Sequence, residues 1–104
     1  MAITNLKGTP TNATNSGTTI ATATVAGITG STMYITDLAC ASDLAGAVMT
    51  AKVGATVVWE HILSANTTSI FRFGSPLSGT SGSSMSVTVN GTALCKANIA
   101  GYYL

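Results

Sequence analysis

Hydrophobic and polar residues alternate along much of the chain with the two-residue period of β-strands, and no segment sustains the pattern of an amphipathic helix. The clearest alternation lies in Ser84–Val89, where a methionine and two valines fall on one face and serine and threonine on the other. Ala39–Ala51 is the best helical candidate, but its central Gly46 and β-branched ends favour a loop followed by a strand. Runs rich in threonine, valine, isoleucine and aromatic residues predict further strands at Ile20–Val25, Met33–Leu38, Ala47–Val53, Thr56–Leu63, Ser69–Phe73 and within Thr92–Leu104.

Turn signals separate these runs. Gly54 is expected to join the runs on either side of it in a hairpin. Asn90-Gly91 is the strongest hairpin signal, because this pair tolerates the positive φ angles of a type I′ turn. The segment Gly74–Ser83, rich in glycine and serine, is expected to be a loop. Seven or eight short strands in about a hundred residues predict an all-β fold, a two-sheet antiparallel β-sandwich of jelly-roll or immunoglobulin-like type.

The first part of the chain is more polar than the rest. Gly8–Thr18 reads GTPTNATNSGT, and this composition predicts an extended arm or loop. We therefore divide the chain into an extended polar N-terminal arm at residues 1–19 and a β-sandwich domain at residues 20–104. Within that domain, the weakly apolar Ile20–Val25 is expected to be an edge strand.

Charged residues are scarce: they make up 7% of the 104 residues, against about 25% in a typical globular protein, and the net charge is +1. A surface this poor in charge is weakly protected against self-association. The lysine and arginine residues are scattered, which argues against nucleic acid and against an electrostatic membrane anchor as partners. No apolar stretch is long enough to span a membrane, and the N-terminus lacks the pattern of a signal peptide. Synthesis in a reducing cytosol is therefore expected, which favours buried thiols at Cys40 and Cys95 over a disulfide.

Candidate catalytic and ligand-binding residues do not converge. His61 is the only histidine, and its neighbour Glu60 is expected to point to the opposite face of a strand, so the two cannot share a site. The Gly74–Ser81 segment lacks the lysine of a phosphate-binding loop and precedes a strand. Cys40, Cys95 and His61 show no metal-ligand spacing. We therefore expect a protein that is not an enzyme, that has no catalytic, cofactor-binding or metal-binding residues, and that works by binding.

The aromatic residues divide between an expected core and an expected surface. Trp59, Phe71 and Phe73 lie in strongly apolar strands, which favours core positions for them over a sugar-stacking role. The adjacent tyrosines near the C-terminus must point to opposite faces of a strand, so the outward one is a candidate contact for a partner. The candidate interface residues are Tyr102, Tyr103, Tyr34 and Pro10.

Two stretches of the chain carry a resemblance. Val57–Leu104 reads VVWEHILSANTTSIFRFGSPLSGTSGSSMSVTVNGTALCKANIAGYYL, in which a tryptophan-bearing strand, a phenylalanine strand, a Pro-Leu-x-Gly loop, an alternating strand and a terminal Gly-Tyr-Tyr strand follow one another. Ile35–Thr56 reads ITDLACASDLAGAVMTAKVGAT and has the form of an earlier hairpin. Together these stretches, about two thirds of the chain, resemble the small β-sandwich virion proteins of tailed bacteriophages. Ala2–Thr19 shows no such likeness.

The resemblance implies a late structural protein of a virion. The leading hypothesis is a capsid decoration (cement) protein, synthesised in the host cytoplasm, that binds and stabilises the shell. Its partners would be the major capsid protein or other virion proteins and further copies of itself, with a trimer expected by analogy. The alternative is a carbohydrate- or receptor-binding module of a head fibre or tail, which predicts exposed aromatic residues, Tyr34 or Trp59 first. No cofactor is expected in either case.

Overall fold

Residues 9–43, 45–90 and 94–104 are described by a computed structural model of the chain. They form eight β-strands, and no helix among them is long and apolar enough to cross a membrane. The strands are β1 (Thr9–Gly17), β2 (Ile20–Val25), β3 (Met33–Ser42), β4 (Val48–Val53), β5 (Thr56–Ile62), β6 (Ser69–Ser78), β7 (Met85–Asn90) and β8 (Cys95–Tyr103). The prediction of an all-β fold is confirmed.

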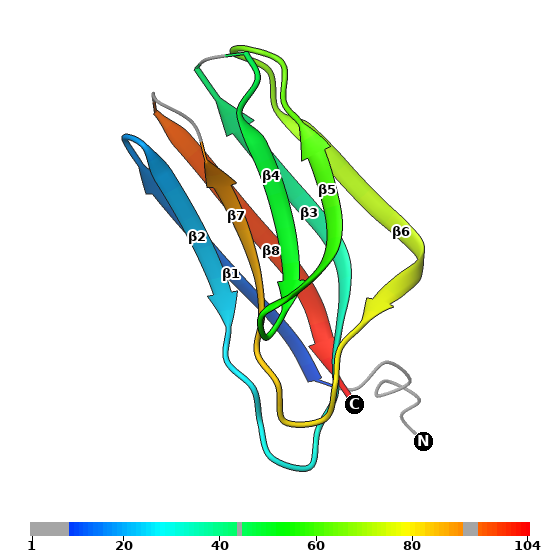
Figure 1. Cartoon of the computed structure of the whole chain (residues 1–104). Coiled ribbons are helices and arrows are strands. Elements are labelled where there is room, and N and C mark those ends of the chain that lie inside the picture. The colour runs from blue at the N-terminus through cyan, green and yellow to red at the C-terminus, as the bar shows by residue number, and fades with distance from the viewer. Residues whose placement is uncertain (1–8, 44, 91–93) are drawn as a thin grey trace.

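The strands form two four-stranded antiparallel sheets that pack face to face (Figure 1). Sheet A has the order β1-β8-β3-β6, and sheet B has the order β2-β7-β4-β5. Apart from the β4–β5 hairpin, each strand is followed by a strand of the opposite sheet, as in an eight-stranded jelly roll. An immunoglobulin sandwich would instead join its first, second, fifth and fourth strands in one sheet. Of the two predicted types, the strand order is therefore that of the jelly roll.

The core lies between the sheets and takes alternate residues from most strands. In β2 the alternation is strict, with Ala21, Ala23 and Val25 buried and the residues between them exposed. Burial of apolar area is worth roughly 25 cal/mol per Å², so these inward rows are the main source of stability. The largest fully buried side chains are Met33, Ile35, Leu38, Cys40, Met49, Leu63, Met85, Val87, Val89, Cys95 and Ile99.

The two cysteines are buried thiols, as the expected reducing compartment predicts. Burial raises the pKa of the Cys40 thiol from 9.0 to about 11, and a hydrogen bond with the backbone of Asn98 offsets only part of that rise. Cys95 lies opposite Ser42 in the β3–β8 ladder. Both side chains therefore serve the core as small apolar groups.

The predicted N-terminal arm is wrong for the part of it that is described. Thr9–Gly17 form β1, which pairs with β8 along its whole length at the edge of sheet A. The polar composition was misleading because an edge strand gains its backbone hydrogen bonds from one neighbour and needs few apolar side chains. The sandwich therefore includes residues from Thr9 onward, while residues 1–8 lie outside the described part of the chain.

The turn predictions have mixed outcomes. β4 and β5 form the predicted hairpin, with Gly54 at a φ of 56°, and β2 is an edge strand as predicted. The hairpin predicted at Asn90-Gly91 is wrong, because β7 pairs with β2 and β4 whereas β8 pairs with β1 and β3. Each of these two strands has a buried row, so they face each other across the core instead of pairing edge to edge. Gly91 itself is outside the described residues.

Strand β6 is longer than predicted and takes up Gly74–Ser78, the first half of the expected loop. Its ladder with β3 is irregular: Leu77 pairs with Ile35, but Arg72 already pairs with Asp37. The extra residues bulge out of the ladder and bend the strand, as Figure 1 shows. β6 is an edge strand, and an edge tolerates such a bulge.

Candidate functional site

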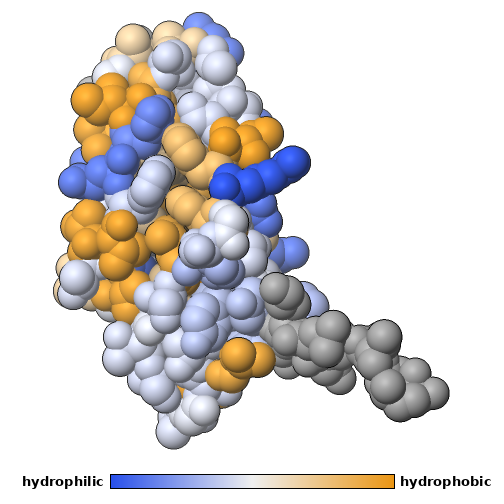
Figure 2. Space-filling model, turned by 90° about the vertical axis from the view of Figure 1, so that its right-hand side faces the viewer, coloured by the Kyte–Doolittle hydropathy of each residue, from blue (hydrophilic) through white to orange (hydrophobic). Residues whose placement is uncertain are grey.

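One narrow side of the sandwich leaves large hydrophobic side chains in solvent. It is formed by β5 and β6, the edge strands of the two sheets, and we call it the open side. All seven residues of β5 are exposed. Nine large hydrophobic residues are exposed in the described part of the chain, and five belong to this side: Val57, Val58, Trp59, Ile62 and Ile70. Figure 2 shows this side of the molecule, where hydrophobic side chains spread along its length among a few strongly hydrophilic ones.

An aromatic cluster bridges β5 and β6. The Trp59 ring meets the edges of Phe71 and Phe73, with ring centroids 6.0 and 5.2 Å apart, and His61 meets Phe71 at 4.9 Å. Phe71 and Phe73 are partly buried against the core. Trp59 is 37% exposed, so the core position predicted for it is wrong. Its strand lies at the edge of the sheet, where only one neighbouring strand covers it.

Glu60 and His61 point to opposite faces of β5, as predicted. His61 lies opposite Met49, whose side chain is fully buried, whereas Glu60 lies opposite Thr50 on the outer face of sheet B. The histidine ring packs against an aromatic edge and the carboxylate stands in solvent. In the described part of the chain, no group of three histidine, cysteine or acidic side chains lies close enough to hold a metal ion.

Three of the four candidate interface residues lie in one row on the outer face of sheet A. Tyr102 of β8 lies between Pro10 of β1 and Tyr34 of β3. The two tyrosine rings stack with centroids 5.2 Å apart and planes 18° from parallel. We call this group the tyrosine row. It presents two half-buried aromatic rings, from β3 and β8, beside an exposed proline of β1.

Tyr103, the fourth candidate, points the other way. It lies opposite Met33, which is buried, and its ring packs against the core. Its hydroxyl donates a hydrogen bond of 2.7 Å to the carbonyl oxygen of Ala26, just after β2. The structure therefore gives Tyr103 an internal position that ties sheet A to the end of β2, and Tyr102 is the outward member of the pair.

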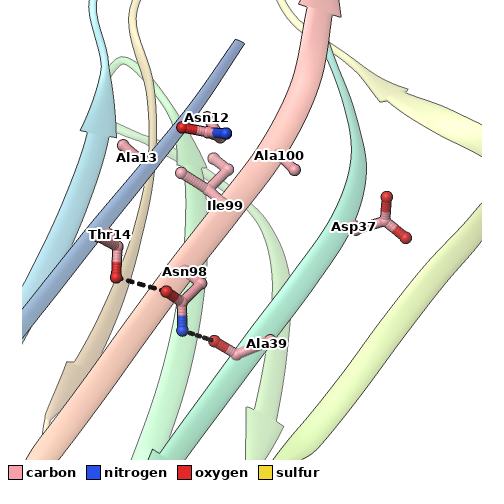
Figure 3. Close-up of a pocket in the computed structure, with 8 residues that line it drawn as sticks. All are labelled: Asn12, Ala13, Thr14, Asp37, Ala39, Asn98, Ile99 and Ala100. Atoms are coloured by element: carbon pink, nitrogen blue, oxygen red, sulfur yellow. Dashed lines mark hydrogen bonds between the residues drawn. The ribbon is translucent and has the colours of Figure 1, made fainter. Parts of the chain in front are cut away.

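A hollow of about 370 Å³, lined mainly by apolar atoms, lies on the same outer face, beside the tyrosine row (Figure 3). Small side chains at Ala39 and Ala100 leave the space. Asn98 of β8 reaches both neighbouring strands: its Oδ1 accepts a hydrogen bond from the Thr14 hydroxyl, and its Nδ2 donates to the Ala39 carbonyl at 3.1 Å. Asn98 and Thr14 thus add hydrogen-bonding groups to a hollow whose lining is mainly apolar. The residues that line it are Asn12, Ala13, Thr14, Asp37, Ala39, Asn98, Ile99 and Ala100.

Asp37 supplies the negative charge of the hollow. Its Oδ2 accepts a hydrogen bond of 2.9 Å from the Thr36 hydroxyl. Its Oδ1 lies 3.8 Å from Nε of Arg72, whose side chain is 82% exposed. An ion pair at this distance and exposure is worth little, so Arg72 is available for other contacts.

The hollow and the open side were not predicted from the sequence. Sequence analysis did not identify Asn12 and Thr14 because they fall in the segment predicted to be an arm. It did not identify Asn98 because that residue belongs to no known ligand-binding motif. The alternation of polar residues in Thr9–Gly17 was the available signal, since it places Asn12 and Thr14 on one face once the segment is a strand. The exposure of β5 follows from its place in the sheet order, which local composition does not reveal.

No family model, curated protein or solved structure matches this chain. The two surfaces described above, the open side and the tyrosine row with its hollow, are therefore the basis for a functional proposal.

Proposed function

We propose that this protein is a structural component of a bacteriophage virion, a capsid decoration protein that binds the shell and stabilises it. The observation that carries the proposal is the open side, where a chain of 104 residues keeps five large hydrophobic side chains in solvent. Exposed apolar surface of this kind marks a contact with a partner. The jelly-roll strand order and the resemblance of Ile35–Thr56 and Val57–Leu104 to phage virion proteins give that partner its proposed identity.

The proposed mechanism is adhesion. The scarcity of charge supports it, because neutral threonine, serine and glycine surfaces lose little hydration energy when they are covered. A standard interface covers roughly 800 Å² on each partner, which is about one seventh of the 5757 Å² surface of this chain. A symmetric shell repeats each contact many times, so even a weak contact gives strong retention.

The test is the composition of purified particles. Phage particles are induced from the genome that carries this gene, purified on a density gradient, and analysed by quantitative mass spectrometry. We expect the protein in a fixed ratio to the major capsid protein. Particles from a gene-deletion strain should release their DNA at a lower temperature, and added recombinant protein should restore the original value. Absence of the protein from the particles would contradict the proposal.

The tyrosine row supports a second candidate function, binding of a carbohydrate or host receptor. Stacked aromatic rings beside a hollow walled by Asp37, Asn98 and Thr14 combine the apolar face and the hydrogen-bonding groups that a sugar requires. Screening against a glycan array tests it. Binding that falls at least about tenfold in Tyr102→Ala, but persists in Trp59→Ala, would favour this function at this place.

A further inference from the structure

The open side has the features of a self-complementary interface. We propose that it binds a second copy of this chain, with β5 of each copy pairing antiparallel with β6 of the other about a two-fold axis. The pairing takes up the same open side from which the virion role is argued, so in such a dimer the contact with the shell would lie elsewhere on the molecule. It replaces the trimer expected from the resemblance with a two-fold dimer.

Both strands have one edge that no described strand pairs with. Within residues 9–43, 45–90 and 94–104, β5 pairs only with β4, and β6 pairs only with β3. An exposed edge strand offers a row of unpaired backbone groups, and proteins normally protect it with charges, prolines or bulges. Here the protection is local: the irregularity of β5 lies before Trp59, and Pro76 and the bulge of β6 lie after Arg72. The segments 59–62 and 70–72 keep a regular register with their neighbouring strands, and Phe73 follows directly at the start of the bulge.

In one antiparallel register, each residue of segment 59–62 lies opposite a residue of segment 70–73 of the second copy that points to the same face and has a compatible side chain. Trp59 and His61 face inward on β5, as Phe71 and Phe73 do on β6. The outward residues of the two segments are an acid and an isoleucine on β5, and a base and an isoleucine on β6. An antiparallel alignment places Trp59 opposite Phe73, Glu60 opposite Arg72, His61 opposite Phe71 and Ile62 opposite Ile70 of the second copy. Aromatic pairs, β-branched pairs and pairs of opposite charge are the cross-strand combinations that stabilise sheets.

Charge selects this arrangement over pairing of β5 with its own copy. Glu60 stands on the outer face of sheet B, and Arg72 stands on the outer face of sheet A, next to Asp37. A two-fold axis parallel to the strands brings sheet B of one copy into line with sheet A of the other, so the acid meets the base twice in the dimer. An axis across the strands would instead bring the two Glu60 flanks together and the two Arg72 flanks together. Like charges across strands are destabilising.

The dimer would also bury the most exposed apolar residues of these strands. Ile62 is 67% exposed and Ile70 is 61% exposed, and the alignment places them against each other. The aromatic clusters of both copies would form one continuous layer under the joined strands. Each four-stranded sheet would continue into the partner's sheet as eight strands, in the order β2-β7-β4-β5 followed by β6-β3-β8-β1.

The first test is the solution mass of the full chain, measured by analytical ultracentrifugation from low to high micromolar concentrations. We expect twice the chain mass for the unaltered protein. Ile62→Asp should weaken the dimer at least about a hundredfold, because it forces an unpaired carboxylate into an apolar contact. Ile20→Asp is the matched control: Ile20 is 52% exposed on β2, the opposite edge of the same sheet, and its replacement should leave the dimer intact.

A charge exchange tests the register. Glu60→Arg should weaken the dimer about tenfold by placing two cations opposite each other, and combining it with Arg72→Glu should recover most of the loss. Two introduced cysteines give a second test that does not depend on weakening the contact. In a chain carrying both Ile62→Cys and Ile70→Cys, the proposed register places each introduced cysteine of one copy opposite the other introduced cysteine of the second copy. Residues opposite each other in an antiparallel ladder have Cα atoms roughly 4.5–5.5 Å apart, which lies within the range of about 4.4–6.8 Å that a disulfide requires. That double variant should cross-link between chains under oxidation, and each single variant should not.

Three results would overturn the dimer. They are a monomer at every concentration, a dimer or trimer that Ile62→Asp leaves unchanged, and cross-linking by either single cysteine variant alone. A monomer that binds purified particles through Ile62 would also reject the second copy as the occupant while keeping the virion role. Conversely, a two-fold dimer that is absent from particles would keep this inference and remove the virion role.

Discussion

The two narrow sides of the sandwich differ in the size of their inward side chains, which are small on one side and large on the other. At the closed side, where β1 and β2 follow each other in the chain, the inward positions of these strands include Ala13, Ala21 and Ala23. At the open side, the inward positions of β5 and β6 carry Trp59, Phe71 and Phe73 together with His61. Small side chains let two sheets approach, and large ones hold them apart. β1 lies against β2 accordingly, whereas β5 and β6 meet through aromatic rings.

This difference in side-chain size explains why the core is fully covered on the closed side but only partly covered on the open side. On the closed side, the chain passes directly from one sheet into the other and the backbones cover the core. On the open side, the aromatic cluster covers the core but stays partly exposed itself. A second set of strands can complete that side without any change in the rest of the molecule. Because the large inward side chains lie at the open side, we expect the proposed interface there and not at the closed side.

The largest expected effect comes from adding one methyl group at the closed side. A Cβ atom on Gly17 would lie 2.0 Å from the carbonyl oxygen of Ile20, so the backbone must move. We expect Gly17→Ala to lower the free energy of unfolding by about 3 kcal/mol, measured by chemical denaturation. Gly74→Ala is the matched change at the open side, where a Cβ meets nothing within 4 Å, and it should stay within about 0.5 kcal/mol of the unaltered protein. Equal losses in the two variants would refute the contrast between the sides.

A smaller effect tests whether the aromatic cluster keeps water out of the core. Burial raises the pKa of Cys40 from 9.0 to about 11, so the folded protein keeps a proton that the unfolded chain releases between these values. The stability contributed by the protonated thiol is complete below pH 9 and is lost as the pH rises toward 11. At pH 10 the linkage amounts to about 1.4 kcal/mol. Cys40 lies opposite Ser69 of β6, so water entering through the open side would reach it.

Denaturation curves at pH 8, 9 and 10 measure this loss. The unaltered protein should lose more stability over this range than Cys40→Ala, since the alanine variant lacks the Cys40 thiol whose pKa is raised. Cys95→Ala keeps Cys40 and should retain its contribution. If the unaltered protein and Cys40→Ala depend on pH identically, the core is hydrated from the open side and the cluster does not seal it.

How far the sequence predicts this fold is clear from particular strands. Alternation in Ser84–Val89 correctly predicts the buried row of β7, and the weakly apolar composition of Ile20–Val25 correctly predicts that β2 is an edge strand. Alternation shows which residues of a strand face inward, but it does not show which strand lies beside it. Asn90-Gly91 favours a local hairpin, and the need to cover two buried rows at once overrides that preference. In Thr9–Gly17, a ladder with β8 makes a strand of a segment whose composition is typical of a loop.

The candidate surfaces follow the same division. The alternation of side chains along a strand predicts that Tyr102 and Tyr103 point to opposite faces, and they do. The row formed by Pro10, Tyr102 and Tyr34 depends on the register of three strands that are distant in the chain, so no local pattern could predict it. The exposure of Trp59 likewise depends on the end position of β5 in its sheet. Residue chemistry suggested which side chains are candidate contacts, and sheet order decided where those side chains lie.

The smallest expected effect concerns the hydrogen bond that helps to fasten the closed side. The Tyr103 hydroxyl donates to the Ala26 carbonyl at 2.7 Å and so links β8 of sheet A to the chain just after β2 of sheet B. Tyr103→Phe removes only that bond and should lower the free energy of unfolding by about 1 kcal/mol. Tyr102→Phe makes the same change one residue earlier, where the hydroxyl has no hydrogen bond within the described residues, and should stay within about 0.5 kcal/mol. If chemical denaturation gives the two variants the same stability, the bond does not fasten the closed side, and the small inward residues alone keep the sheets together there.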